Sequence, residues 1–155
     1  MSNKFNNFNN LYNSWKKKCE ETVKEVVPSV MKDKMQEAIE YEVYAKYTPK
    51  SYIRRKENGG LLDKKNMVER IEVNRNKITV YLFNNTLGND KYKYHTNDYI
   101  DSIIVTGRGY TWKSSEIYKN PIKRDFYKET EKLLNDGELR NAIIKELRQK
   151  GIIVV

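Results

Sequence analysis

The stretch "FNNLYNSWKKKCEETVKEVVPSVMKDKMQEAIEYEVYAKY", residues 8–47, decides the fold class of this 155-residue chain. Apolar side chains recur in it every three or four residues, which is the period of one face of an α-helix. The spacing predicts an amphipathic helical region over about residues 10–46, and Pro28 should either kink it or begin a second helix. Because the apolar stripe continues across Pro28, the kink is favoured. The stripe consists of Phe8, Leu11, Trp15, Cys19, Val23, Val26, Val30, Met31, Met35, Ile39 and Val43.

The segment that follows, residues 47–66, is predicted to be a connector loop. Thr48 precedes a proline and is therefore pushed toward extended backbone. Two glycine motifs resemble ligand-binding loops, but "ENGGLLD" (57–63) lacks the Lys-Ser or Lys-Thr pair of a phosphate loop, and "GRG" (107–109) is too short for a dinucleotide fingerprint. Both are therefore interpreted as turns that need positive φ.

Apolar and polar residues alternate in "MVERIEVNRNKITVYLFNNT", residues 67–86, which predicts a β-hairpin over 67–83 with a tight turn at 74–77. The tyrosine-rich segment 84–120 is predicted to be a long loop with one short helix near 98–106. Helices are expected over 121–150, with Pro121 at a helix start and Asp136 as an N-cap. The apolar tail "IIVV" is either an edge strand or a contact with another subunit.

These elements define one α+β domain over residues 1–155, in which a long kinked N-terminal helix and C-terminal helices pack on a small antiparallel β-sheet. With 30 Lys and Arg against 21 Asp and Glu, the formal charge is +9, which favours a polyanionic partner. Lysine is spread along the whole sequence, however, which is typical of a solvated surface. No apolar run approaches the roughly 18 residues that span a bilayer, so we expect synthesis in the cytoplasm and no membrane partner.

Residues suited to catalysis are scarce. His95 is the single histidine, and the single cysteine, Cys19, is expected to be buried on the helix stripe, so neither a nucleophile–histidine pair nor a cysteine-based metal cluster is predicted. Acidic residues alternate with lysines, as on a salt-bridged helix face, rather than clustering as metal ligands do. We expect no enzymatic activity, no cofactor and no metal.

Aromatic residues are concentrated in the predicted loops. "KYKYH", residues 91–95, interleaves basic and aromatic side chains and could stack single-stranded bases. Tyrosine and tryptophan also anchor protein interfaces, and with no nucleic-acid-binding motif nearby this second interpretation is favoured. Tyr52 is expected to pack the connector down, and Arg54 and Arg55 to project toward acidic groups of a neighbouring subunit. The candidate interface residues are Tyr52, Arg54, Arg55, Tyr92, Tyr94, Tyr110, Trp112 and Arg124.

Short motifs follow one another along the chain: Tyr47, Pro49, Tyr52, Arg54 and Arg55, then Gly60, Leu61 and Leu62, then Trp112, Pro121, Arg124 and Phe126. With the order of the elements, these motifs resemble the HK97 gp10-like family of tailed-phage neck and tail-completion proteins. The resemblance covers about residues 35–151. It departs from the family pattern at "NNTLGNDKYKYHTNDYI" (84–100), where that family usually carries tyrosine-alanine and glutamate-tyrosine-glycine stretches.

This resemblance implies a non-enzymatic virion protein that forms an oligomeric ring, a hexamer or a dodecamer, at the head–tail junction. Its implied neighbours are portal or adaptor proteins and tail tube or terminator proteins, with non-specific contact to passing DNA. Residues 84–120 are then expected to become ordered only in the assembly. The charge and the "KYKYH" stretch support an alternative, a small basic DNA- or RNA-binding protein.

Overall fold

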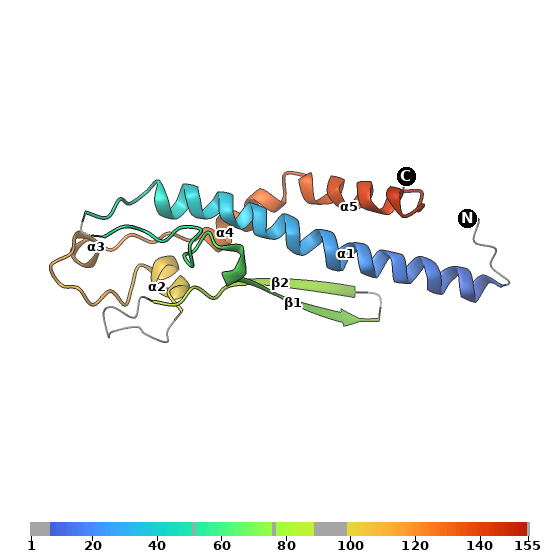
Figure 1. Cartoon of the computed structure of the whole chain (residues 1–155), viewed down its shortest axis with the longest axis horizontal. Helices are drawn as coiled ribbons and strands as arrows, with labels where there is room; N and C mark the ends of the chain where they lie inside the picture. Colours follow the sequence, from blue (N-terminus) through green and yellow to red (C-terminus); the bar gives the residue numbers. More distant parts are fainter. Residues whose placement is uncertain (1–6, 51, 76, 89–98, 155) are drawn as a thin grey trace.

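The computed structural model describes residues 7–50, 52–75, 77–88 and 99–154. It confirms the α+β class: helices pack around a two-stranded antiparallel sheet. Figure 1 shows an elongated subunit in which α1 runs along most of the length, with α5 on one side of it and the β1–β2 hairpin on the other. The elements are α1 (Phe8–Ile39), the π-helical turn η1 (Glu40–Tyr44), the 3-10 turn η2 (Lys64–Asn66), β1 (Met67–Asn74), β2 (Lys77–Asn84), α2 (Asp101–Thr106), α3 (Glu116–Lys119), α4 (Phe126–Leu134) and α5 (Glu138–Gln149).

Helix α1 continues across Pro28, so no second helix begins there. It starts at Asn7, whose side-chain oxygen accepts a hydrogen bond from the Asn10 N–H at 2.9 Å and so satisfies one of the free N–H groups of the first turn. The helix passes directly into η1, whose last turn closes with the Ala45 N–H donating to the Glu40 carbonyl. The helical region thus ends two residues before the predicted boundary at residue 46.

The hairpin has the predicted position, and its register pairs Met67 with Asn84 and Asn74 with Lys77. Because side chains alternate between the two faces of a strand, Met67 and Leu82 point to the same face, and both are buried. Glu69 lies on this face as well and forms an ion pair with Lys32 of α1, with 2.6 Å between nitrogen and oxygen. One face of the sheet therefore packs on α1.

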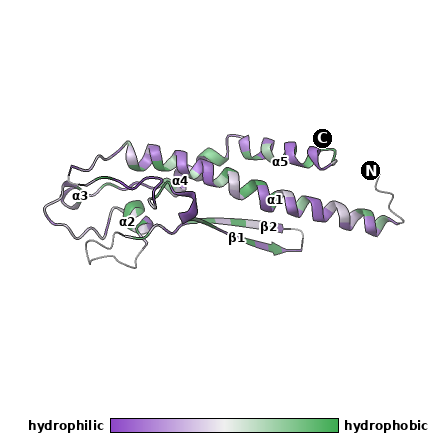
Figure 2. Cartoon of the chain, in the orientation of Figure 1, coloured by the Kyte–Doolittle hydropathy of each residue, from purple (hydrophilic) through white to green (hydrophobic). Residues whose placement is uncertain are grey.

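The hydrophobic core lies where α1, the connector, the hairpin and α4 meet. Burying each large aliphatic or aromatic side chain contributes about 1.5–3 kcal/mol. Figure 2 shows hydrophobic residues at intervals along α1 and along both strands. The core contains Met35, Ala38, Ile39, Val43, Leu61, Leu62, Met67, Leu82, Ile104 and Phe126.

A buried polar network fixes how these elements meet. Asn84, which is fully buried, donates from Nδ2 to the Leu61 carbonyl at 2.8 Å, and its Oδ1 accepts from the Thr86 hydroxyl at 2.6 Å. The Tyr127 hydroxyl accepts from the Asn84 N–H at 2.9 Å and donates to the Asp101 carboxylate at 2.8 Å. Because a buried polar group without a partner is destabilising, this network favours one arrangement of the connector, hairpin, α2 and α4.

Several local predictions for the C-terminal half are wrong. Helix α4 begins at Phe126 with Asp125 as its N-cap, so Pro121 lies before the helix rather than at its start. The N-cap of α5 is Gly137, and the Asp136 carboxylate instead accepts from the Glu138 N–H at 2.8 Å. The predicted 84–120 loop contains α3 in addition to the expected short helix α2.

Two further expectations concern Cys19 and the C-terminal tail. Cys19 is half-buried rather than buried. Residues 152–154 are not a strand, and Ile153 is 90% exposed. Among the helices that the structure describes, none has the length and apolar character to cross a membrane.

The turn at Gly59-Gly60 needs both glycines for different reasons. Gly59 has a φ of 73°, a left-handed conformation that residues with a Cβ adopt at a cost. A Cβ on Gly60 would lie 2.4 Å from the Lys56 carbonyl oxygen and 2.6 Å from the Lys56 nitrogen, closer than such atoms can approach. The turn brings Leu61 and Leu62 into the core, so its geometry positions the connector.

Candidate functional site

Two segments that are far apart in sequence meet at one end of the molecule, and we call this end the tip. It consists of residues 45–50 and 52–58, from the end of η1 into the connector, and residues 107–125, which include α3. Figure 1 shows both at the end opposite the start of α1. The tip contains six of the eight residues predicted at an interface. The other two, Tyr92 and Tyr94, and also His95, lie outside the described residues.

Arg54 holds the connector against the end of η1. Its guanidinium donates hydrogen bonds to the carbonyl oxygens of Tyr44, at 3.1 Å, and Tyr47. The guanidinium carbon lies 4.7 Å from the centroid of the Tyr44 ring, in cation–π contact. Arg54 is therefore bound to its own chain, and the prediction that it projects toward a neighbouring subunit is wrong.

Arg124 has a similar internal role in the second segment. It is only 4% exposed, so the prediction that it lies on an interface surface is wrong. Its Nη2 donates a hydrogen bond to the Tyr110 hydroxyl, and its backbone N–H donates to the Ile104 carbonyl at 3.1 Å. Nε of Arg124 is buried and has no hydrogen-bond partner in the described part of the chain.

The ring of Tyr47 joins the two segments of the tip. The guanidinium carbons of Arg54 and Arg124 each lie 5.6 Å from its centroid. Burial raises the pKa of Tyr44 to about 12, with the charge of Arg54 acting in the opposite direction, and burial also raises the pKa of Tyr47 and of Tyr110. These phenols stay protonated at neutral pH, where they bind neighbours by hydrogen bonds and ring contacts rather than act as bases.

The outer surface of the tip carries the remaining predicted residues. Tyr52, which was predicted to pack the connector down, is 53% exposed, and Trp112 is 54% exposed. Arg55 is exposed and donates a hydrogen bond to the Leu87 carbonyl. A shallow open groove of about 550 Å³ runs along the connector and is lined by Glu40, Tyr44, Thr48, Tyr52, Ile53 and Lys56, among others.

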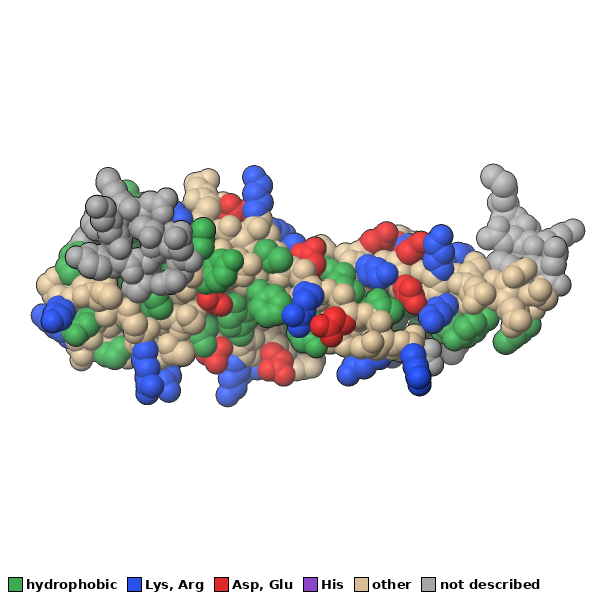
Figure 3. Space-filling model, turned by 90° about the horizontal axis from the view of Figure 1, so that it is seen from below, with side chains coloured by type: hydrophobic (Ala, Val, Ile, Leu, Met, Phe, Trp, Pro, Cys, Tyr) green, Lys and Arg blue, Asp and Glu red, His purple; other side chains and the backbone are tan. Residues whose placement is uncertain are grey.

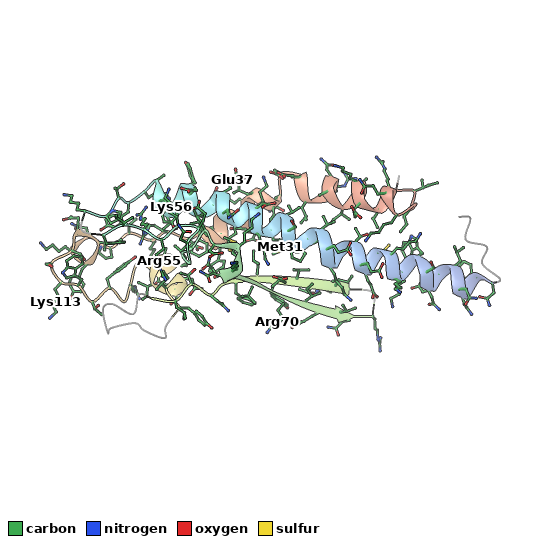
Figure 4. All side chains as sticks on the ribbon, viewed as in Figure 1. Met31, Glu37, Arg55, Lys56, Arg70 and Lys113 are labelled. Carbon is green, nitrogen blue, oxygen red and sulfur yellow. The ribbon has the colours of Figure 1, made fainter. Side chains whose placement is uncertain are left out.

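The positive charge of the chain is concentrated at the tip. Its two segments contain ten Lys and Arg against three Asp and Glu, a net charge of +7 out of +9 for the whole chain. Lysine is spread along the sequence, but in the fold most of the positive charge that acidic residues do not balance lies at this one end. Figure 4 shows Arg55, Lys56 and Lys113 there, and Figure 3 shows Lys and Arg side chains around the edge of this end.

Two apolar surfaces lie away from the tip, and the sequence interpretation missed both. The hairpin face is the outer side of the sheet, where Val68 pairs with Phe83 and Arg70 with Tyr81. The guanidinium carbon of Arg70 lies 4.7 Å from the Tyr81 ring centroid, and Figure 4 shows Arg70 on the side of the hairpin away from α1. Apolar residues at alternate positions on both faces of the strands were the signal that could have revealed this surface.

The helix face consists of the first three residues of the α1 stripe, which the sequence pattern alone would place in the core, together with the neighbouring Tyr12. Its four side chains are between 42% and 77% exposed, and no described residue buries them. They are Phe8, Leu11, Tyr12 and Trp15, at the spacing of one helical stripe. In Figure 1 this end of α1 extends beyond the hairpin and α5.

In residues 7–50, 52–75, 77–88 and 99–154, no three His, Cys, Asp or Glu side chains are grouped so that they could hold a metal ion. What the described surface offers is therefore a basic tip and two apolar faces. Surfaces of these kinds contact macromolecules through charge and apolar area.

The chain belongs to the YomN family, whose family model matches residues 7–149. A relative is the SPbeta prophage-derived uncharacterized protein YomN of Bacillus subtilis (strain 168), which is 42% identical over 53 residues. This match covers 34% of the chain and only 38% of that relative. No solved structure matches the chain. The comparisons therefore indicate a phage-derived family, and they make no assignment to the HK97 gp10-like family.

Proposed function

We propose that this chain is a structural protein of a tailed-phage particle and forms an oligomeric ring at the head–tail junction. Its membership of a family with a prophage-derived relative supports a phage origin. The resemblance in element order to neck and tail-completion proteins supports the place in the particle. In this proposal the chain is made in the cytoplasm of the bacterial host, has no catalytic activity, and contacts portal or adaptor proteins on one side and tail proteins on the other.

The main support for a ring is that one elongated subunit has two different apolar faces. The helix face, at Phe8 to Trp15, and the hairpin face, at Val68, Tyr81 and Phe83, are both exposed. A contact between the helix face of one copy and the hairpin face of the next leaves one face of each kind free. Such head-to-tail contacts repeat until the rotation closes, which is how rings form.

The test uses one variant for each face. Trp15→Glu places a charge on the helix face, and Phe83→Glu places one on the hairpin face. Size-exclusion chromatography with light scattering should show a ring for the unmodified chain and monomers for each variant alone. An equimolar mixture of the two variants should form dimers, because one intact helix face still meets one intact hairpin face.

The matched control is Tyr41→Glu, since Tyr41 is 65% exposed and lies on neither face. This variant should assemble like the unmodified chain. A ring that persists in both Trp15→Glu and Phe83→Glu would contradict the proposed contact. So would a mixture that contains only monomers while the unmodified chain assembles. An unmodified chain that stays monomeric both at high concentration and with its co-purifying neighbours would contradict the ring itself.

A further inference from the structure

We infer that the tip is a binding site for the phosphate backbone of double-stranded DNA. The inference goes beyond the ring, because a subunit in any oligomeric state can carry such a site. It rests on the net charge of +7 that residues 45–50, 52–58 and 107–125 bring to one end of the molecule. A polyanion is the ligand that a surface of this charge density attracts most strongly.

Six of the ten basic side chains of the tip are available to a ligand. Lys46 and Lys56 form ion pairs with Glu42 and Glu40, and Arg54 and Arg124 are held internally. The other six are exposed and form no salt bridge with another residue that the structure describes. They are Lys50, Arg55, Arg108, Lys113, Lys119 and Lys123.

The buried part of the tip explains why these charges stay together. Tyr47 lies against both Arg54 and Arg124, so the connector and the 107–125 segment are fixed to one another. Tyr52 and Trp112 are also exposed on the tip, and each has a polar hydrogen that can be donated to a phosphate oxygen. The site is thus built from two segments rather than from one run of lysines.

The available side chains of the tip suit a ligand with many regularly spaced phosphates. Arginine recognises carboxylates and phosphates alike, because its planar fork matches either group in two hydrogen bonds. Here two of the four arginines of the tip are internal, and four of the six available cations are lysines. Lysine acts as a compact point charge, which suits a regular row of phosphates and gives no sequence preference.

The expected binding is steeply dependent on salt. Six phosphate contacts give a slope of log K against log salt of about −5, so the affinity should fall roughly a thousandfold between 50 and 200 mM salt. Fluorescence anisotropy of a labelled 30-base-pair duplex measures this slope. Two duplexes of unrelated sequence should bind with equal affinity.

Two variants, each of which lacks four lysines, distinguish DNA binding at the tip from attraction by the net charge of the whole chain. The tip variant is Lys50→Gln, Lys113→Gln, Lys119→Gln and Lys123→Gln. The control variant is Lys24→Gln, Lys65→Gln, Lys77→Gln and Lys145→Gln, which are exposed lysines elsewhere that form no salt bridge with a described residue. The tip variant should bind at least about tenfold more weakly at 50 mM salt with a slope smaller by about 3 to 4, and the control should change by less than about twofold.

The two tryptophans report where DNA binds, because Trp112 is on the tip and Trp15 is on the helix face. In a Trp15→Phe chain, DNA should change the emission of Trp112. In a Trp112→Phe chain, the emission of Trp15 should not change. Each variant carries a single tryptophan, so the signal is assigned without ambiguity.

Three results would overturn the inference. They are no binding of the unmodified chain at 20 mM salt, equal loss in the tip and control variants, and displacement of the duplex by poly-glutamate at equal charge concentration. The last result would assign the tip to acidic proteins. The DNA titration is carried out at a protein concentration at which the chain has a single oligomeric state. A failure to bind DNA therefore does not contradict the ring, which the light-scattering experiment tests separately.

Discussion

Arg124 donates a hydrogen bond from Nη2 to the hydroxyl oxygen of Tyr110, and this contact closes the second segment of the tip on itself. The guanidinium of Arg124 also faces Tyr47 of the connector, so one buried side chain links residues that are 77 positions apart in the sequence. The sequence interpretation assigned Arg124 to a surface, whereas its structural role is internal.

Replacing Arg124 should therefore destabilise the chain. Arg124→Ala leaves a cavity and removes the partner of the Tyr110 hydroxyl, and we expect a loss of about 2–4 kcal/mol in the free energy of unfolding. Urea denaturation followed by circular dichroism measures it. The neighbouring Lys123 is exposed, so Lys123→Ala should change the free energy by less than about 0.5 kcal/mol. Equal effects of the two substitutions would mean that Arg124 contributes no packing.

The two adjacent glycines of the connector should respond differently to alanine. A Cβ on Gly60 meets the backbone of Lys56, which cannot move aside, and we expect Gly60→Ala to cost about 3 kcal/mol or more. A Cβ on Gly59 meets no atom within 4 Å, so Gly59→Ala should cost only about 1 kcal/mol, the strain of its positive φ. Thermal unfolding of both variants tests the order, and a larger loss for Gly59→Ala would contradict it.

Lys34 holds α1 to the turn between α4 and α5. Its Nζ lies 3.1 Å from an Asp136 oxygen and 2.6 Å from a Glu138 oxygen, and hydrogen bonds to Glu138 and Asp136 raise the pKa of Lys34. Lys34→Met leaves these carboxylates together without a cation, so we expect Tm at pH 7 to fall by about 3–6 °C.

The effect of Lys34→Met should disappear in acid. The Glu138 N–H, and then Lys34, lower the pKa of Asp136. A carboxyl with a lowered pKa stabilises the fold above its unfolded pKa of about 4, and this contribution is lost as the pH falls further. The two Tm curves should therefore converge below about pH 3. A difference that stays constant down to pH 2 would mean that packing, not charge, is responsible.

Stability should also fall in alkali. Burial raises the pKa of Tyr127 well above its usual value, and donation to the Asp101 carboxylate acts in the same direction. A raised pKa means that the phenol stabilises the fold at every pH below its unfolded pKa of about 10, and that this contribution is lost as the pH rises above it. The free energy of unfolding should decline above pH 10 in urea titrations. Tyr127→Phe should be less stable at pH 7 but should decline less steeply.

In the C-terminal half, the helices do not begin where the local sequence signals predicted. Pro121 is a favourable first residue for a helix, yet the next helix begins only at Phe126, because Arg124 is fixed by Ile104 and Tyr110. The Ser115 side chain accepts a hydrogen bond from the Tyr118 N–H and caps the start of the one-turn helix α3. A helix of a single turn is too short to produce a recognisable periodic pattern in the sequence. Both differences come from contacts with residues distant in the sequence or from single turns that periodicity does not detect.

The sequence by itself determined the long helix, the hairpin, the C-terminal helices and hence the α+β class, because hydrophobic periodicity and proline and glycine positions act locally along the chain. Only the tertiary structure decided which part of the α1 stripe is core and which is exposed, since Trp15 and Met35 both belong to the stripe of three- and four-residue spacing but only Met35 is buried. It also decided that Arg54 and Arg124 are internal and that the tip carries most of the net charge. Burial and charge density depend on which distant segments meet, and a one-dimensional pattern does not contain that information.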